Sequence, residues 1–177
     1  ISIDGKYAIY TNNNWSAIGA SLLSDYGSTA EILHTGDRVN ANMSYNGQVM
    51  MYLIDGKDFK ISNDYGSTWN SKSNMVNIMP EAISNDGKII AGRNWSNTSE
   101  LYLSTNSGDS KTLITNSIFN KPWCNESGKY IIYYDDGSKE IMKSEDYGNT
   151  FSALTNLPVD LNNYTFRSIQ RNLRTSI

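Results

Sequence analysis

The sequence predicts an all-β fold, a β-propeller in which four repeats each form a four-stranded antiparallel blade. Two motifs predict this fold, because each returns four times along the 177 residues and the two stay in phase. The step between copies is about 40 residues, which is the length of one blade in several propeller repeats. Short β-rich runs stand between the motifs, and four short strands per repeat are typical of a blade.

The first motif is an eight-residue turn, called the long turn below. Its copies are residues 23–30, 62–69, 104–111 and 144–151. The acid or amide at its third position is expected to accept hydrogen bonds from backbone N–H groups across the turn, and the Gly to take a conformation closed to other residues. An aromatic residue at the last position fills the gap beneath. The structural residues are therefore Asp25, Gly27, Asp64, Gly66, Trp69, Asn106, Gly108, Asp146, Gly148 and Phe151.

The second motif, called the short turn below, occupies residues 2–6, 44–48, 84–88 and 125–129. The first strand of each blade runs into it, as residues 78–84 do, and the second strand leaves it, as in 88–93. A hairpin of variable length follows, at residues 12–16, 55–56, 94–99 and 136–137. Asp-Gly at 55–56 and at 136–137 predicts turns in which both central residues have positive φ. The third strand then alternates, as in 59–61 or 101–103, and a turn leads into the fourth.

These repeats define a single domain over 1–177, with boundaries near 1–38, 39–77, 78–119 and 120–160, and with 161–177 as a closing strand and tail. The first repeat begins without a first strand, and residues 163–169 resemble such a strand one period after 121–125. One reading is a four-bladed ring closed by this C-terminal strand, which would remove exposed sheet edges. The other is a larger ring of about six to eight blades, of which these four are a part. The match between missing and surplus strands favours closure.

The long turns resemble the Asp-box (BNR) repeat, S-x-D-x-G-x-T-W, of sialidases, sortilin-type receptors and photosystem-assembly propellers. The match is complete at 62–69 and near-complete at 144–151. It is degraded at 23–30, with Leu for Ser and Ala for Trp, and at 104–111, with Asn for Asp and Lys for Trp. The resemblance covers most of the chain and implies a propeller whose turns lie away from the binding face.

Within this resemblance, a sialidase would need three arginines that clamp a carboxylate, a Tyr–Glu nucleophile pair and an Asp acid/base. The arginines of this chain are Arg38, Arg93, Arg167, Arg171 and Arg174. Three of them crowd the tail, the N-terminal FRIP motif of that family is missing, and the acids are scattered over turns. We therefore expect a non-catalytic module, and keep a sialidase-like glycoside hydrolase, or its inactive remnant, as the alternative.

The loops offer a candidate binding face. Trp15 and Trp95 occupy nearly the same point of the hairpins in the first and third repeats. On a propeller these hairpins share a face with the connections between blades, which places His34 and Arg38, and Arg93 at the strand end, nearby. Exposed Trp beside Asn suits stacking on a sugar or docking of a protein. The alternative is that both tryptophans fold back over blade edges.

Composition narrows the classes of partner. The net charge is −3, which gives no basic field for nucleic acid. No apolar run approaches the roughly 20 residues of a membrane span. The one histidine and the one cysteine, Cys124, support no metal site, and no cofactor is expected. The chain opens at Ile1, so we expect a processed product or a piece of something longer.

The predicted function is therefore a binding or structural propeller that contacts a protein or a glycan. A component of a virus particle or another large assembly, at an extracellular or virion surface, fits the AT-rich type of composition and the compact all-β build. The ligand and the compartment are left open by the sequence.

Overall fold

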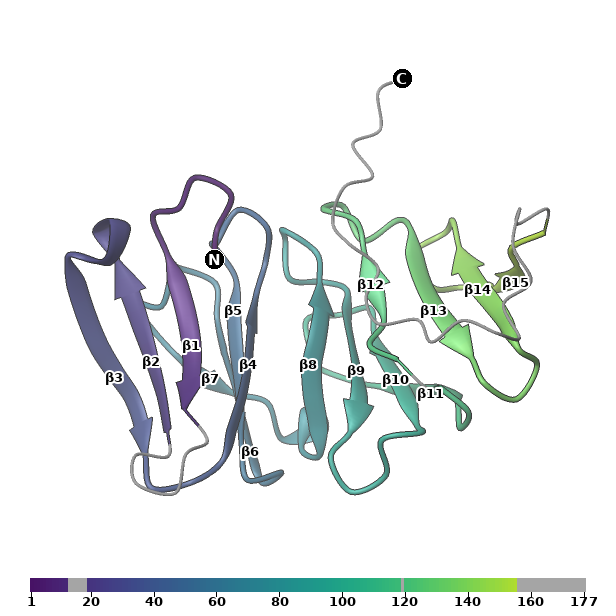
Figure 1. The fold of residues 1–177 in the computed structure, drawn as a ribbon, viewed down its shortest axis with the longest axis horizontal. Helices are drawn as coiled ribbons and strands as arrows, with labels where there is room; N and C mark the ends of the chain where they lie inside the picture. The colour runs from purple at the N-terminus through teal and green to yellow at the C-terminus, as the bar shows by residue number, and fades with distance from the viewer. Residues whose placement is uncertain (13–18, 119, 156–177) are drawn as a thin grey trace.

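The computed structural model describes residues 1–12, 19–118 and 120–155. The predicted all-β architecture of antiparallel blades is confirmed: four antiparallel sheets follow one another along the chain, and Figure 1 shows them side by side in one row. We call them blades 1 to 4. In these ranges no helix is long and apolar enough to cross a membrane.

Each blade is a meander whose strands pair in chain order. Blade 1 contains β1 (Ala8–Asn12), β2 (Gly19–Ser24) and β3 (Thr29–Thr35). Blade 2 contains β4 (Val39–Met43), β5 (Met50–Ile54), β6 (Asp58–Ser62) and β7 (Asn70–Ser71). Blade 3 contains β8 (Ile78–Ile83), β9 (Ile90–Asn94), β10 (Leu101–Ser104) and β11 (Thr112–Thr115). Blade 4 contains β12 (Trp123–Cys124), β13 (Ile131–Asp135), β14 (Glu140–Ser144) and β15 (Ser152–Ala153). Two short 3-10 segments, η1 (Asp25–Gly27) and η2 (Ser73–Met75), complete the structure.

The innermost strands hold the row together. β1 lies against β4, β4 against β8, and β8 against β12. Blade 1 differs from the others because β1, its innermost described strand, corresponds to the second strand of the other blades. The predicted closing strand at 163–169 lies outside the described residues, so the structure does not show closure of the ring.

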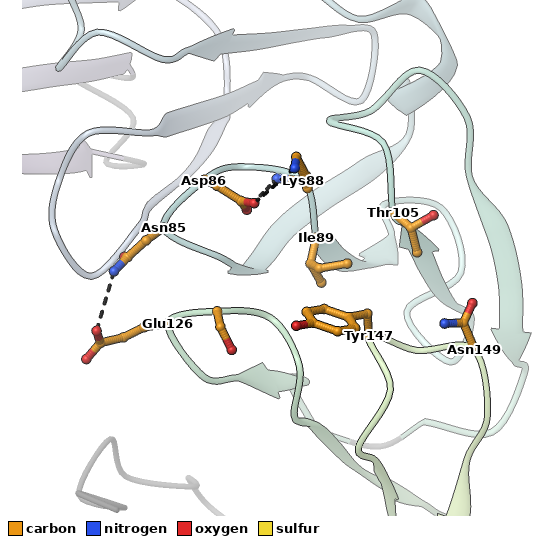
Figure 2. A pocket seen from close by; sticks show the side chains of 9 residues that line it. Asn85, Asp86, Lys88, Ile89, Thr105, Glu126, Tyr147 and Asn149 are labelled. Atoms are coloured by element: carbon orange, nitrogen blue, oxygen red, sulfur yellow. Dashed lines mark hydrogen bonds and ion pairs between the residues drawn. The ribbon is translucent and has the colours of Figure 1, made fainter.

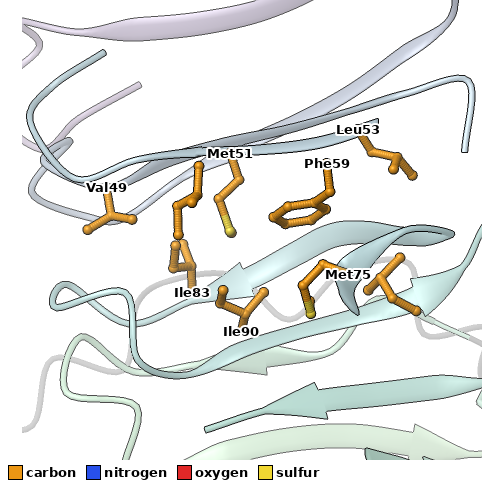
Figure 3. Close-up of a cluster of buried hydrophobic side chains, with 9 residues drawn as sticks. Val49, Met51, Leu53, Phe59, Met75, Ile83 and Ile90 are labelled. Atoms are coloured by element: carbon orange, nitrogen blue, oxygen red, sulfur yellow. The ribbon is translucent and has the colours of Figure 1, made fainter. Parts of the chain in front are cut away.

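The core consists of apolar layers between successive blades. Between blades 2 and 3 it is formed by Val49, Met51, Leu53, Phe59, Ile61, Met75, Ile78, Ile83 and Ile90, all nearly excluded from solvent (Figure 3). Alternate residues of β5 and β6 face this layer, as the period of two in a strand requires. Burial of each large side chain contributes about 1.5–3 kcal/mol. Similar layers lie between blades 1 and 2 and between blades 3 and 4.

The hydrogen bonds predicted for the long turn are present in blades 2, 3 and 4. In blade 2, Asp64 accepts hydrogen bonds from Thr68 N at 2.9 Å and from Thr68 Oγ1 at 2.6 Å. The hydroxyl of Ser62 donates to the same carboxylate at 2.7 Å and accepts from Gly66 N at 2.9 Å. Asp146 and Ser144 make the same contacts in blade 4, with Thr150 and Gly148 as the donors. The turn is thus closed by one carboxylate and one buried hydroxyl.

Blades 1 and 3 show what the degraded copies of this turn lose. In blade 3, Asn106 still accepts from Ser110 N at 2.9 Å and donates to Ser110 Oγ at 2.9 Å, so an amide can close the turn. In blade 1, Leu23 replaces the serine. The carboxylate of Asp25 is mostly exposed and lies 4.0 Å from Lys6 Nζ, while the hydroxyl of Ser28 donates to the main-chain oxygen of Asp25.

The aromatic residues at the end of the long turn lie as expected. Trp69 packs on Tyr52 with ring centroids 4.7 Å apart. Phe151 meets Tyr133 edge to face at 5.4 Å. Cys124 is partly buried and packs against the layer between blades 3 and 4.

The two Asp-Gly hairpins differ. Asp55 and Gly56 have φ values of 46° and 73°, so the predicted turn is confirmed there. At 136–137 the prediction is wrong, because the residue with positive φ is Lys139. The carboxylate of Asp135 accepts hydrogen bonds from Gly137 N and Ser138 N, and this side-chain turn replaces the tight hairpin.

The long-turn glycines make a direct test of blade packing possible. Gly148 and Gly27 both have φ of 84°, but a methyl group on Gly148 would lie 2.1 Å from Leu103 Cδ2, whereas one on Gly27 would have no atom of the described residues within 4 Å. Both Ala variants carry the same backbone strain of about 1–2 kcal/mol. We expect Gly148→Ala to lower the free energy of unfolding by a further 1–3 kcal/mol, roughly, through overpacking. Urea denaturation of dilute protein measures the free energy of unfolding of both Ala variants. Equal losses in the two variants would contradict this account.

The long-turn carboxylates predict that the free energy of unfolding falls as the pH is lowered. Hydrogen bonds from Thr68 and Thr150 lower the pKa of Asp64 and Asp146 below the ordinary value of 3.8. A lowered folded pKa gives stability that is present above the unfolded pKa and lost as pH falls through the folded one. We expect an Asp64→Asn/Asp146→Asn variant to lose less stability than the parent chain between about pH 5 and pH 2.

The measurement is urea denaturation as a function of pH. An Asp136→Asn variant is the control, because that exposed carboxylate pairs with Lys139 across the loop. If the free energy of unfolding of the double variant depends on pH as that of the parent chain does, these two carboxylates are not the cause of the loss of stability in acid.

Candidate functional site

A cavity of about 680 Å³ opens between the turns of blades 3 and 4. It lies where the short and long turns of both blades meet, and Figure 2 shows its walls. The lining residues are Asn85, Asp86, Lys88, Ile89, Thr105, Glu126, Ser127, Tyr147 and Asn149. The volume is within the range of about 300–1,000 Å³ that is usual for pockets for small ligands.

The cavity forms at this boundary because of the residues at two positions, the one after the short turn and the fourth of the long turn. Between blades 1 and 2, the long-turn Tyr65 stacks on Tyr7, with ring centroids 5.1 Å apart and an interplanar angle of 26°. In blade 3 the residue that corresponds to Tyr7 is Ile89, which is shorter. Figure 2 shows the ring of Tyr147 beneath Ile89, both residues line the cavity, and Tyr147 is 46% exposed.

The rim of the cavity is polar and links the two blades. Asn85 N donates to Glu126 O at 2.7 Å, and the side-chain amide of Asn85 donates to Glu126 Oε2 at 3.5 Å. Asp86 accepts a hydrogen bond from Ser84 Oγ at 2.6 Å and another from Lys88 N at 3.0 Å. Burial alone would raise the pKa of Asp86, but these hydrogen bonds outweigh it and leave the pKa below its ordinary value.

This arrangement supplies one flat aromatic ring, amides that both donate and accept, and carboxylates that accept. Asp86 stays ionised at neutral pH and is held by the turn. The cavity can therefore recognise hydroxyl and amide groups of a ligand. Within the described ranges, no three His, Cys, Asp or Glu side chains come together as ligands for a metal ion.

The residues that the sequence placed on a loop face lie at the other end of the blades. Figure 1 shows the connections between blades leaving from the end opposite to the N-terminus. His34 and Asp37 meet there at 2.9 Å, and Asp55 N donates to the main-chain oxygen of Arg38. Trp15 lies outside the described residues.

Trp95 is partly buried and packs on blade 2. A methyl group on Gly56 would lie 3.0 Å from Trp95 Cδ1, and the indole borders the apolar layer between blades 2 and 3. Trp95 N also donates to Asn77 O at 2.7 Å. This placement corresponds to the second of the two readings, in which the tryptophan folds back over a blade edge.

Arg93 forms a buried ion pair that the sequence did not predict. Its guanidinium contacts both oxygens of Glu81, with Nη2–Oε1 at 2.7 Å and Nε–Oε2 at 2.9 Å. The side chains are 17% and 3% exposed. A β-bulge between Pro80 and Ala82 places Glu81 in this position. A proline followed by an acid inside an apolar strand was the available signal.

The described members of the predicted binding face each have contacts of their own. The structure brings His34 close to Asp37 and commits Arg93 to Glu81, while Trp95 serves packing. The cavity residues were missed, because the sequence marks the long turns only as structural. The signal that could have found them is a tyrosine in a long turn combined with a short residue after the preceding short turn.

No family model matches the chain, and no curated protein matches it. Solved structures do. TolB from Acinetobacter baumannii aligns with a TM-score of 0.59 and 18% identity, over 84% of this chain and 41% of TolB. The GH74 enzyme of Niastella koreensis gives a TM-score of 0.54 and 17% identity, over 84% of this chain and 24% of the enzyme. A chain of a nidogen/laminin complex gives 0.53 and 9%, over 85% of this chain and 59% of that one.

This chain therefore spans less than two thirds of each of these structures. At such identities the likeness shows the fold alone, which is that of β-propeller blades.

The ion pair in blade 3 gives a stability prediction. Replacement of Arg93 by Met leaves Glu81 buried without its partner, which costs about 3–5 kcal/mol of folding free energy. The control is Lys57→Met, which removes an exposed pair with Asp55 and costs under about 1 kcal/mol. Urea denaturation compares the two. A loss as small for Arg93→Met as for the control would mean that water reaches Glu81.

Proposed function

We propose that this chain is a non-catalytic β-propeller module that binds a polar partner, a glycan or a glycan-like face of a protein, in the cavity between blades 3 and 4. The observation that carries the proposal is the partly exposed ring of Tyr147 inside a polar rim. Aromatic rings offer a large, rigid, apolar surface at low entropic cost. A sugar ring presents a C–H face to such a surface and hydroxyl groups to its surroundings.

The rim suits those hydroxyl groups. Asn85 and Asn149 carry amides, and Asp86 and Glu126 carry carboxylates, at the edge of the same cavity. Lys88 is the cation among the lining residues and lies 3.7 Å from Asp86. The charges favour a neutral or cationic ligand over an acidic one, because two carboxylates stand against one ammonium group.

Two features support binding rather than hydrolysis. A general acid needs a raised pKa, whereas the pKa of Asp86 is lowered by the turn that holds it. Arg93, which would be needed to clamp a substrate carboxylate, is already bound by Glu81 on both oxygens. The fold itself does not distinguish binding from hydrolysis, because the similar structures include an enzyme and a protein complex.

The wider role proposed from the sequence, a component of a virus particle or another large assembly at an extracellular surface, is compatible with such a module. A sialidase-like hydrolase stays the alternative, and the same experiment addresses it.

The test is binding to a panel of immobilised neutral and sialylated oligosaccharides, with Tyr147→Ala as the variant. We expect binding to fall at least tenfold, roughly the effect of losing an aromatic anchor. Tyr26→Ala is the matched control, since Tyr26 holds the same position of the long turn in blade 1 and is 75% exposed. Equal binding by both variants, or turnover of sialosides by the wild-type chain, would refute the proposal.

A further inference from the structure

The same contact, called the joint below, recurs at the three boundaries between described blades: a short-turn glycine of one blade packs against the preceding blade. Each short-turn glycine of a following blade meets the blade before it. A methyl group on Gly87 would lie 3.0 Å from Val49 Cγ1, and one on Gly128 would lie 2.5 Å from Ile89 Cγ1. On Gly47 it would lie 3.4 Å from Tyr7 Cδ2. In each case the residue just after the short turn of the preceding blade fills the space above the glycine.

In the part of the chain that the structure describes, no residue of another blade enters the corresponding notch of blade 1. Among the described atoms, the one nearest to a methyl group on Gly5 is Cδ1 of Tyr26 in the same blade, at 4.0 Å, and a methyl group on Gly27 would meet none within 4 Å. The corresponding long-turn glycines, Gly66 and Gly148, are in close contact with the preceding blade. The described part of the chain thus leaves the face of blade 1 that points away from blade 2 uncovered. We call this face the leading face.

The leading face has the residues of a blade interface. Tyr10, Ser21 and Ile32 are cross-strand neighbours and therefore lie in one row. Ile9, one residue from Tyr10, packs instead toward blade 2. Tyr10 and Ile32 are 50% and 70% exposed.

A comparison along the repeats shows what normally covers this row. Tyr52 and Tyr133 hold the position of Tyr10 in blades 2 and 4, and each faces the preceding blade at 5% and 3% exposure. The tyrosine at this position is therefore buried in both of these blades, while blade 3 carries Gly92 there. Tyr10 lacks such a blade among the described residues.

The complementary surface exists at the other end of the same chain. Tyr130 follows the short turn of blade 4, as Val49 and Ile89 do in blades 2 and 3, and it is 37% exposed. In Figure 1, blade 1 and blade 4 stand at opposite ends of the row. Among the described residues, blade 1 thus displays an uncovered notch, and blade 4 displays at Tyr130 the position that covers such a notch at the other boundaries, with Lys129 Nζ 5.5 Å from the centroid of its ring.

We infer that the leading face of blade 1 docks onto blade 4 of a second copy of this chain, head to tail. Tyr130 of one copy enters the notch at Gly5 of the other and covers Tyr10. A head-to-tail contact forms a closed ring when its rotation permits. Two copies give eight blades, which is within the usual range for propellers.

The test is sedimentation velocity of the 177-residue chain across a range of micromolar concentrations. We expect a dimer. A leading variant, Tyr10→Glu/Ile32→Glu, and a trailing variant, Tyr130→Glu, should each weaken the dimer by at least thirtyfold, roughly the effect of losing an interface anchor. Leu113→Glu is the control, because Leu113 is an apolar residue of β11 that is 48% exposed but lies away from both faces.

A mixture of the two variants tests the head-to-tail arrangement most directly. In an equal mixture of leading and trailing variants, one joint per pair is intact, so a dimer should return although neither variant dimerises alone. A wild-type chain that stays monomeric overturns the inference. So does a dimer that survives both variants, or one that only the leading variant disrupts, because that pattern indicates two leading faces in contact. Circular dichroism melting of each variant verifies that the blades are folded.

Discussion

The close approach of each blade to the turn glycines of the next is the contact on which this structure depends. A blade is a thin sheet and cannot bury its own apolar faces, so stability comes from stacking. The stacking distance is set where a side chain such as Ile89 or Leu103 lies directly over a glycine of the following blade. Any Cβ at Gly128 or Gly148 would force the blades apart. The hydroxyl and carboxylate of the long turn hold the glycine in place, which ties turn chemistry to core packing.

The cavity follows from the same contact. Each boundary combines the residue after one short turn with the fourth residue of the next long turn. Tyr7 with Tyr65 fills the space by stacking, whereas Ile89 with Tyr147 leaves it open. The side chain after the short turn thus distinguishes a boundary with stacked rings from one that contains a cavity. Function on this fold can vary from boundary to boundary while the scaffold stays constant.

The repeats could be predicted from sequence because their turns act locally: Asp64 and its partners lie within one eight-residue segment. The failures involve non-local or competing contacts. Asp136-Gly137 does not form the expected hairpin because Asp135, one residue earlier, accepts hydrogen bonds from the loop. The pair of Glu81 and Arg93 depends on a bulge at Pro80–Ala82, and the Pro-Glu step that marks the bulge does not indicate which residue of the next strand Glu81 meets. The cavity depends on two blades at once, so no single motif indicates it.

Three of the four long turns carry a tyrosine that closure of the turn does not require. Tyr26, Tyr65 and Tyr147 all have positive φ, a conformation that is unfavourable for a bulky residue. Ser107 occupies the same position in blade 3 with φ of 58°, and that turn closes with the same hydrogen bonds from its serine and glycine. The turn therefore does not require an aromatic ring. Tyr26 and Tyr147 are 75% and 46% exposed, so their burial adds less to folding than that of a core tyrosine such as Tyr133, which is 3% exposed.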